Sequence, residues 1–168
     1  VYNKIENTLA AKGNVVFVDK INNYIITSEI INYNKNEETI NTMGDTKSEI
    51  YSRYSINSKD IIFLKNEKII NSNYKTTIID NKYQTLYRLK KFNFILDEEL
   101  LKGHDILVNL NYNLPFNDKL YLESGIFDLK NKSFVAKNIE INLKKDIFDN
   151  LDNDPRLKGI SAIGKNKI

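Results

Sequence analysis

The stretch Ile26-Thr27-Ser28-Glu29-Ile30-Ile31-Asn32-Tyr33 decides the fold class, because its pattern recurs along the chain. A small residue, here Ser28, has hydrophobic residues two positions before it and three and five positions after it. The same pattern surrounds Ser58 and Ser124, and a degenerate copy surrounds Leu89, so that copies follow one another at intervals of about thirty residues. Repeats of this length that are built from short alternating segments indicate stacked β-hairpins.

Alternation of hydrophobic and polar residues marks further strands between these copies. It is clearest over residues 105–114 and 133–143. Successive strand side chains point to opposite faces, so each segment predicts one apolar and one polar face. The acidic segment 97–103 is interpreted as a long hairpin loop. Shorter turns rich in Asn and Lys are predicted at 34–36, 65–67, 80–82 and 130–132.

The composition describes one domain and excludes several classes of chemistry. The 168 residues, of which 41% are hydrophobic, suffice for a sizeable core. A net charge of +3 is too balanced to favour a nucleic-acid partner. No hydrophobic run reaches the roughly 18 residues of a membrane helix. The lack of Cys excludes disulfides within this sequence, thiolate metal sites and a cysteine nucleophile.

The repeat also sets the expected domain boundaries. Residues 2–13 match residues 33–44, so we expect that the chain begins inside a repeat and is a fragment whose domain is truncated at its N-terminus. Alternation ends near Phe148, and Pro155 is unsuited to a central strand. We therefore predict one domain over residues 1–148 and a linker over residues 149–168. The predicted fold is an all-β antiparallel jelly roll, a twisted open sandwich of stacked hairpins.

Residues that carry catalytic chemistry are scarce and scattered. His104 is the only histidine, no serine stands in a nucleophile-elbow context, and the glycines are isolated rather than gathered in a phosphate-binding loop. The adjacent carboxylates of residues 97–99 do not set the separation that glycoside hydrolysis requires. The acidic segment 146–154 lacks the glycine and the terminal glutamate of a calcium loop. The sequence predicts no enzyme, no metal site and no cofactor.

Aromatic residues recur at the hydrophobic positions of the repeat, as Tyr33, Phe63, Phe94 and Phe127 illustrate. Two interpretations remain open, because both bury one face of the sheet. The row either fills a closed sandwich core, or it lines a groove between two splayed sheets that admits a ligand. Stacking on single-stranded nucleic acid is disfavoured, since the aromatic residues follow the hydrophobic row rather than a basic face.

The first repeat resembles the OstA-like repeat of the lipopolysaccharide-transport proteins. The segment Gly13-Asn14-Val15, the stretch 26–33, Ile40 and Gly44 follow one another in the order of that family's pattern. The resemblance covers most of residues 1–143 and is strongest in the first half.

The second half of the chain departs from the family pattern in two ways and adds one further similarity. Later copies have no glycine at the position that matches Gly44, and Leu89 replaces the small residue. The stretch 153–159 is similar to the segment that leads into the outer-membrane barrel in the LptD branch of the family.

The resemblance implies a periplasmic domain that is part of a cell outer-membrane protein of a Gram-negative bacterium. It implies that lipopolysaccharide arrives from a periplasmic bridge protein of the same fold, docked by edge-strand pairing. The lipid then passes to the barrel and its outer-membrane lipoprotein partner for assembly in the outer leaflet. Two alternatives are a free bridge or adaptor protein of the LptA or LptC type and a closed structural sandwich without a ligand. Under the first hypothesis, the lipid A acyl chains contact Phe17, Ile26, Ile31, Tyr33, Ile61, Phe63, Phe92, Phe94, Ile106, Val108, Leu122, Phe127 and Ile139.

Overall fold

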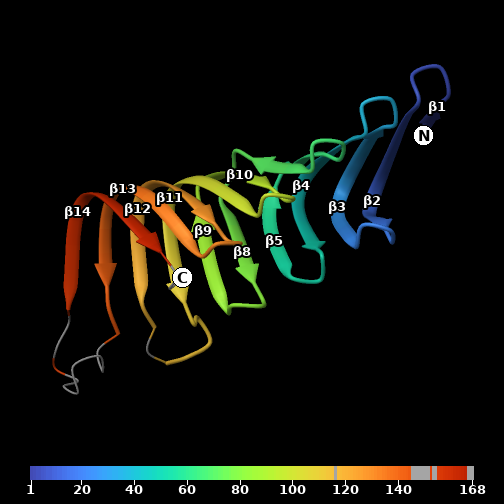
Figure 1. Cartoon of the computed structure of the whole chain (residues 1–168). Helices are drawn as coiled ribbons and strands as arrows, with labels where there is room; N and C mark the ends of the chain where they lie inside the picture. The colour runs from blue at the N-terminus through green and yellow to red at the C-terminus, as the bar shows by residue number, and fades with distance from the viewer. Residues whose placement is uncertain (116, 145–151, 153–154, 166–168) are drawn as a thin grey trace.

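The computed structural model describes residues 1–115, 117–144, 152 and 155–165, and these form antiparallel strands joined by short turns (Figure 1). The prediction of an all-β antiparallel fold is confirmed. Among the described residues, no helix has the length and hydrophobicity to cross a membrane. The strands are β1 (Tyr2–Asn3), β2 (Thr8–Asp19), β3 (Tyr24–Asn34), β4 (Thr39–Ile50), β5 (Tyr54–Lys59), β6 (Ile62–Leu64), β7 (Ile69–Ser72), β8 (Thr76–Asp80), β9 (Thr85–Leu89), β10 (Lys91–Ile95), β11 (Leu100–Leu110), β12 (Lys119–Asp128), β13 (Ser133–Asn142) and β14 (Arg156–Lys165).

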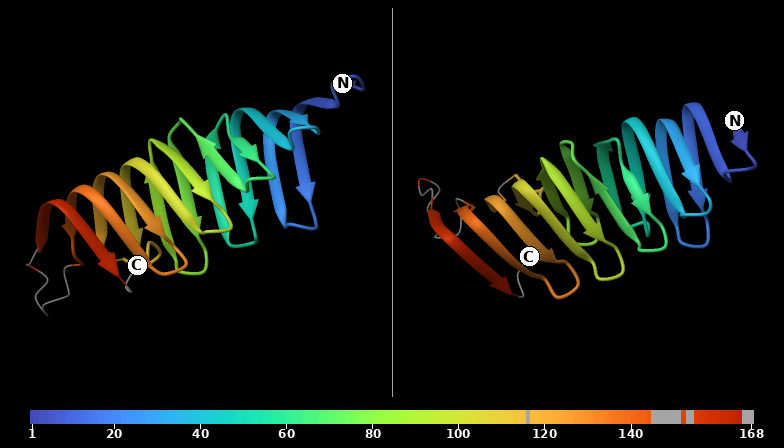
Figure 2. Two further views of the ribbon diagram at one scale, coloured as in Figure 1. Left: turned by 45° about the horizontal axis from the view of Figure 1, so that its top comes forward. Right: turned by 90° about the horizontal axis from the view of Figure 1, so that it is seen from above.

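The central strands close on themselves through hydrogen bonds. They follow the order β4-β5-β8-β9-β11-β10-β7-β6, and β6 pairs back to β4. Strands β1 to β3 extend this ring at one end, and β12 to β14 extend it at the other. The molecule is therefore an elongated stack, with the N-terminus at one end and β14 at the opposite end (Figures 1 and 2). We call each repeat of about thirty residues one winding of this stack.

Two layers arise because each long strand bends near its middle. Residues 39–41 of β4 pair with β6, whereas residues 45–50 pair with β5. Strand β11 divides in the same way, since residues 100–104 pair with β10 and residues 107–110 pair with β9. We call the layer that contains β6, β7 and β10 the first layer and the layer that contains β5, β8 and β9 the second layer.

The bends form one long edge of the sandwich, here called the bend edge. Left-handed backbone conformations turn the chain there, at Asn14, Gly44, Asp60, Asp105 and Asn138, whose φ angles are 47°, 86°, 46°, 48° and 47°. All five are Gly, Asn or Asp, the residue types that adopt positive φ at least cost. The bends of β2 and β3 also carry register shifts, as β-bulges do.

The repeated serine of the sequence pattern lies at this bend edge. Ser28 is buried and donates a hydrogen bond to the carbonyl oxygen of Met43 at 3.0 Å, and the hydroxyl of Thr46 lies 3.1 Å from its Oγ. Ser58 repeats the arrangement with the hydroxyl of Thr76 at 2.7 Å. A small hydroxyl residue recurs because the layers converge there and leave room for little more than a polar contact.

Tight turns form the opposite long edge, here called the hairpin edge. The turns predicted near residues 34–36, 65–67, 80–82 and 130–132 are confirmed. Successive turns are joined by backbone hydrogen bonds, for example from the amide of Lys65 to the carbonyl of Glu38 at 2.9 Å and from that of Leu96 to Lys68 at 2.9 Å. Each winding is thereby held to the next outside the regular strand ladder.

Two predictions from the sequence are wrong in their boundaries. Residues 97–103 form no long loop, because a turn at 96–99 leads directly into β11. The predicted linker over 149–168 contains strand β14, which pairs with β13 along its whole length. Pro155 precedes this strand rather than ending the domain, so it removes no donor from the strand ladder. The predicted domain boundary near Phe148 lies outside the described residues.

Candidate functional site

The interior between the two layers contains every residue that the sequence assigned to acyl chains. Phe17 and Tyr33, near the N-terminal end, are half-buried and pack against the core. The rest are buried core residues with at most 5% of their surface exposed, and they are Ile26, Ile31, Ile61, Phe63, Phe92, Phe94, Ile106, Val108, Leu122, Phe127 and Ile139. The apolar row is therefore continuous through all the central windings.

A second row of aromatic residues faces the first, and of these the repeat pattern had included only Tyr87. Tyr24, Tyr54 and Tyr87 belong to the second layer and are at most 2% exposed. Tyr24 and Tyr54 each stand two positions before the first hydrophobic residue of a repeat, so a wider repeat window would have revealed them, whereas Tyr87 is itself the first hydrophobic residue of the degenerate copy. Their rings meet phenylalanines of the first layer edge to face, with centroids 5.0 Å apart for Tyr24 and Phe63, 4.9 Å for Tyr54 and Phe94, and 5.4 Å for Tyr87 and Phe127. We call these contacts the aromatic pairs.

Arg53 links the two layers at the hairpin edge. Its Nε and Nη2 donate to the two carboxylate oxygens of Asp80 at 3.0 and 2.8 Å, in the second layer. Its Nη1 donates to Oε2 of Glu99 at 2.7 Å, in the first layer. The hydroxyl of Tyr54 donates to the same Glu99 oxygen at 3.1 Å. Burial disfavours the charged guanidinium, but the hydrogen bonds to Asp80 and Glu99 outweigh it and raise the pKa of Arg53.

Lys65 forms a similar link one winding closer to the N-terminus. Its Nζ lies 2.9 Å from Oε2 of Glu38 in the first layer and 3.5 Å from Oδ2 of Asp19 in the second. The hydroxyl of Tyr33 donates to the other Glu38 oxygen at 2.7 Å. Hydrogen bonds from Lys65 and Tyr33 lower the pKa of the Glu38 carboxyl below its ordinary value. Ion pairs and aromatic pairs together close the hairpin edge of the central windings.

The two ends of the stack are less covered than its middle. At the N-terminal end, Leu9 is 46% exposed although it pairs with Tyr33 on the interior face, and residues 15–19 of β2 pair with no described strand other than β3. At the C-terminal end, Leu157 of β14 is 59% exposed, and within the described residues β14 pairs only with β13. Each terminal strand thus leaves apolar interior surface and one backbone edge without a partner strand in the described part of the chain.

A surface hollow of about 720 Å³ near β14 is lined by the interior residues Ile106, Leu122 and Ile139, whereas two others lie along the outside of the bend edge. One of these two, of about 950 Å³, lies beside Thr46 and Ser58, and the other, of about 570 Å³, lies beside Gly103 and Gly125. Neither is lined by a member of the aromatic pairs. His104 borders the hollow of about 570 Å³, while Glu99 is engaged by Arg53.

Comparison with models of protein families gives no match to this chain, and comparison with curated proteins gives none either.

Proposed function

We propose that this domain is an OstA-like jelly roll that carries the acyl chains of lipopolysaccharide through its interior toward an outer-membrane protein. The observation that supports this proposal best is the continuous apolar row from Phe17 to Ile139, beyond which Leu9 and Leu157 are exposed at the two ends of the stack. A row of this kind offers the same surface at each strand, spaced by about 4.8 Å, and no single position where a chain is held most tightly.

The free energy of burial favours such a route for a lipid. Each methylene removed from water contributes about 0.8 kcal/mol, so a twelve-carbon chain contributes on the order of 10 kcal/mol. Separating an aromatic pair costs about 0.5–1.5 kcal/mol beyond the loss of buried area. An acyl chain that replaces an aromatic pair also restores most of that buried area. The burial of one chain therefore offsets the separation of several aromatic pairs.

The terminal strands support the partners that the proposal requires. The free edge of residues 15–19 carries unpaired backbone groups, which a strand of a bridge protein with the same fold can satisfy by β-augmentation. Docking at this end joins the interior of the partner to Phe17 and Leu9. The lipid then moves along the stack toward β14 and the outer-membrane barrel with its lipoprotein partner. The proposed location is the periplasm, with no role for nucleic acid.

A closed structural sandwich is the second candidate, and one observation favours it. Tyr54 and Phe94 are at most 1% exposed, and the ion pairs of Arg53 lie directly beside them. A domain that never opens needs such a seal, whereas a transport domain must break it.

Site-specific photocrosslinking distinguishes the two candidates. A photoreactive residue is placed at Phe63 or at Phe94 in the full-length protein in cells, and the matched control carries it at exposed Lys130. The transport proposal expects lipopolysaccharide to be captured at both interior positions several-fold more than at Lys130. Labelling no higher than that of Lys130, in variants whose melting temperature shows that they fold, would reject transport and leave the closed sandwich.

A further inference from the structure

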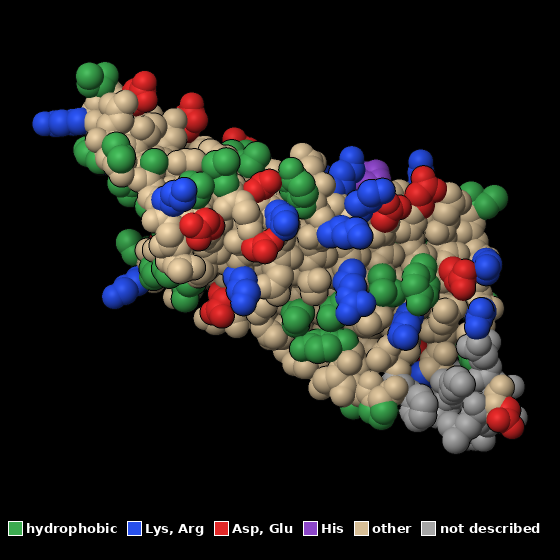
Figure 3. Space-filling model, turned by 180° about the vertical axis from the view of Figure 1, so that it is seen from behind, with side chains coloured by type: hydrophobic (Ala, Val, Ile, Leu, Met, Phe, Trp, Pro, Cys, Tyr) green, Lys and Arg blue, Asp and Glu red, His purple; other side chains and the backbone are tan. Residues whose placement is uncertain are grey.

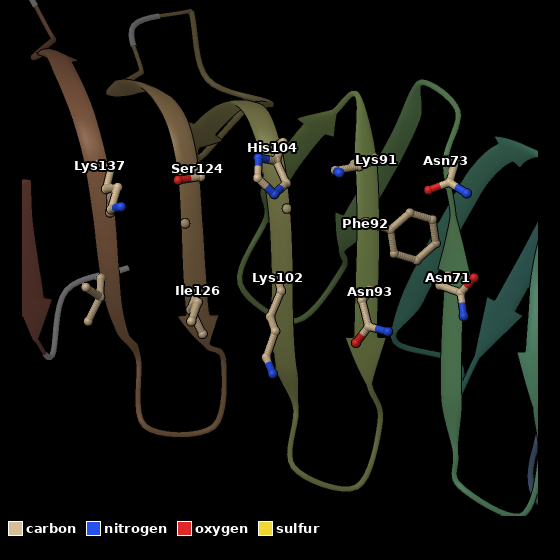
Figure 4. Close-up of a pocket in the computed structure, with 14 residues that line it drawn as sticks. Asn71, Asn73, Lys91, Phe92, Asn93, Lys102, His104, Ser124, Ile126 and Lys137 are labelled. Atoms are coloured by element: carbon tan, nitrogen blue, oxygen red, sulfur yellow. The ribbon is translucent and has the colours of Figure 1, made fainter.

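A hollow on the outer face of the first layer has features of a second binding site. It has a volume of about 570 Å³ and crosses β7, β10, β11, β12 and β13 near the bend edge. Figure 4 shows two rows of side chains that stand on either side of it. One row consists of Asn73, Lys91, His104, Ser124 and Lys137, and the other consists of Asn71, Asn93, Lys102, Ile126 and Val135.

Three small residues, Gly103, Gly125 and Ala136, in register with Phe92, form the floor of the hollow. Phe92 pairs with Gly103, Gly103 with Gly125, and Gly125 with Ala136, so these four residues form one line across the strands. They are buried, and a Cβ added to Gly103 would lie 2.3 Å from the side chain of Leu89 in the core. The line therefore presents backbone to the outside, and the two flanking rows of outward side chains form the walls.

The charge of the walls is positive and uncompensated. Among the described residues, Lys91, Lys102 and Lys137 have no ion-pair partner, whereas neighbouring Lys90 pairs with Asp105 at 3.1 Å. None of the described residues that line the hollow is acidic. In Figure 3, both Lys or Arg and Asp or Glu side chains lie near the single histidine at the upper edge of this face. The register places Lys91 and Lys137 three strands apart, about 14 Å at the spacing between strands, with Lys102 in the facing row, so the three ammonium groups together make the hollow attractive to an anion.

In the row that contains Lys102, the residues on the next two strands, β12 and β13, are apolar. Ile126 and Val135 pair with each other across β12 and β13 and are 45% and 54% exposed. Ile163 of β14 lies next in register, opposite Val135, and is also exposed. The hollow thus places a cationic wall and an exposed apolar ridge side by side, which suits a ligand with an anionic group and a hydrocarbon part.

We propose that this hollow binds a phosphate-bearing amphiphile, with the phosphate among Lys91, Lys102 and Lys137 and the hydrocarbon on Ile126 and Val135. A phosphate group carries up to two negative charges and three acceptor oxygens, which match three ammonium donors better than a single carboxylate does. The site lies outside the interior that the proposed function uses. It therefore goes beyond that function and stands or fails independently of it.

The single histidine provides a direct test in the whole chain. Because the chain has one His, its imidazole signals in an NMR spectrum report on this hollow alone. The probes are dodecyl phosphate below its micelle concentration, inorganic phosphate and the neutral detergent dodecyl maltoside. We expect dodecyl phosphate to shift the His104 signals in a saturable way, at least tenfold more tightly than inorganic phosphate, and dodecyl maltoside to leave them unchanged.

Matched variants assign the effect to the two walls. Lys102→Gln and Lys137→Gln should each weaken dodecyl phosphate binding at least fivefold, Val135→Ser should do the same, and Lys130→Gln, on an exposed turn, should not. Equal binding of inorganic phosphate would instead indicate a free-anion site. Equal binding of dodecyl maltoside would indicate a merely apolar surface. Either result overturns the proposal, and so does unchanged binding of dodecyl phosphate in the Lys variants. None of these three outcomes changes the crosslinking expected at Phe94, so the proposed function is tested separately.

Discussion

Arg53 and Glu99 lie 46 residues apart in the chain, yet Nη1 of Arg53 contacts Oε2 of Glu99 at 2.7 Å and joins the two layers at the hairpin edge. The guanidinium is fixed from the other side by both oxygens of Asp80, whose side chain is only 2% exposed. A contact between turns of different layers cannot form unless the interior between them is closed. This ion pair is therefore a direct indicator of whether the hairpin edge is shut.

Replacement of Asp80 should destabilise the fold strongly. Asp80→Ala leaves the Arg53 guanidinium partly buried without its two-pronged partner, and breaking a buried pair from one side costs about 3 kcal/mol or more. Urea unfolding measures the loss of free energy. The control is Asp45→Ala, because Asp45 forms an ion pair with Lys59 that is largely exposed and contributes at most about 1 kcal/mol. Similar losses in the two variants would show that the Arg53 cluster does not hold the layers together.

Truncation of one ring of an aromatic pair should leave a cavity in the sealed interior. Phe94→Ala removes a fully buried ring that contacts Tyr54 edge to face, so we expect a loss of about 3–5 kcal/mol in the free energy of unfolding. Ile25→Ala, at a position that is 40% exposed, should cost about 1 kcal/mol or less. A small effect of Phe94→Ala would mean that the layers are already apart in solution.

Acid should weaken the Lys65 link through Glu38. The pKa of Glu38 is lower in the folded protein than in the unfolded chain, chiefly because Lys65 and Tyr33 donate hydrogen bonds to the carboxylate. A carboxyl group of this kind contributes stability above its unfolded pKa of about 4.3, and that stability is lost as the pH falls through the folded value. Urea unfolding across pH 2–7 should therefore show a smaller acid-induced loss for Glu38→Gln than for the unchanged protein. Identical pH profiles would contradict the assignment.

Leu89 replaces the small residue of the repeat, and its side chain should be energetically coupled to the absence of a side chain at Gly103. Gly103→Ala places a methyl group against the Leu89 side chain, and such overpacking typically costs about 1–3 kcal/mol. Leu89→Ala alone removes buried surface and also destabilises. In the double variant, the new methyl group occupies space that Leu89 vacates, so the combined loss should be smaller than the two single losses together. Additive losses in the unfolding free energy would exclude this compensation.

The sequence predicted the parts of the fold that depend on local periodicity. Ser28 and Ser58 recur because each donates or accepts a hydroxyl contact at its bend, and Phe63 and Phe94 recur because they fill the same interior position in successive windings. A strict period made these residues visible. Turn positions followed from the same period, since Asn and Lys gather where the chain reverses.

Other features depend on contacts that no local pattern contains. The pairing of Arg53 with Glu99 joins two turns that are adjacent only after the stack has formed. Strand β14 was missed because it lies at the end of the stack, where most of its side chains are exposed and hydrophobic alternation is weak. The period of the sequence also cannot predict whether the interior is closed, because Tyr54 and Phe94 would recur equally in an open groove and in a closed core.

The hydrogen bonds between successive turns have a consequence for how the molecule comes apart. Since each winding contacts mainly the windings before and after it, stability behaves as a chain of neighbour-to-neighbour couplings. Local unfolding should begin at the outermost strands and proceed inward, and the closed ring of strands around Tyr54 should unfold last. An architecture of this type can also lengthen by whole windings during evolution, because an inserted coil only has to match the two that flank it.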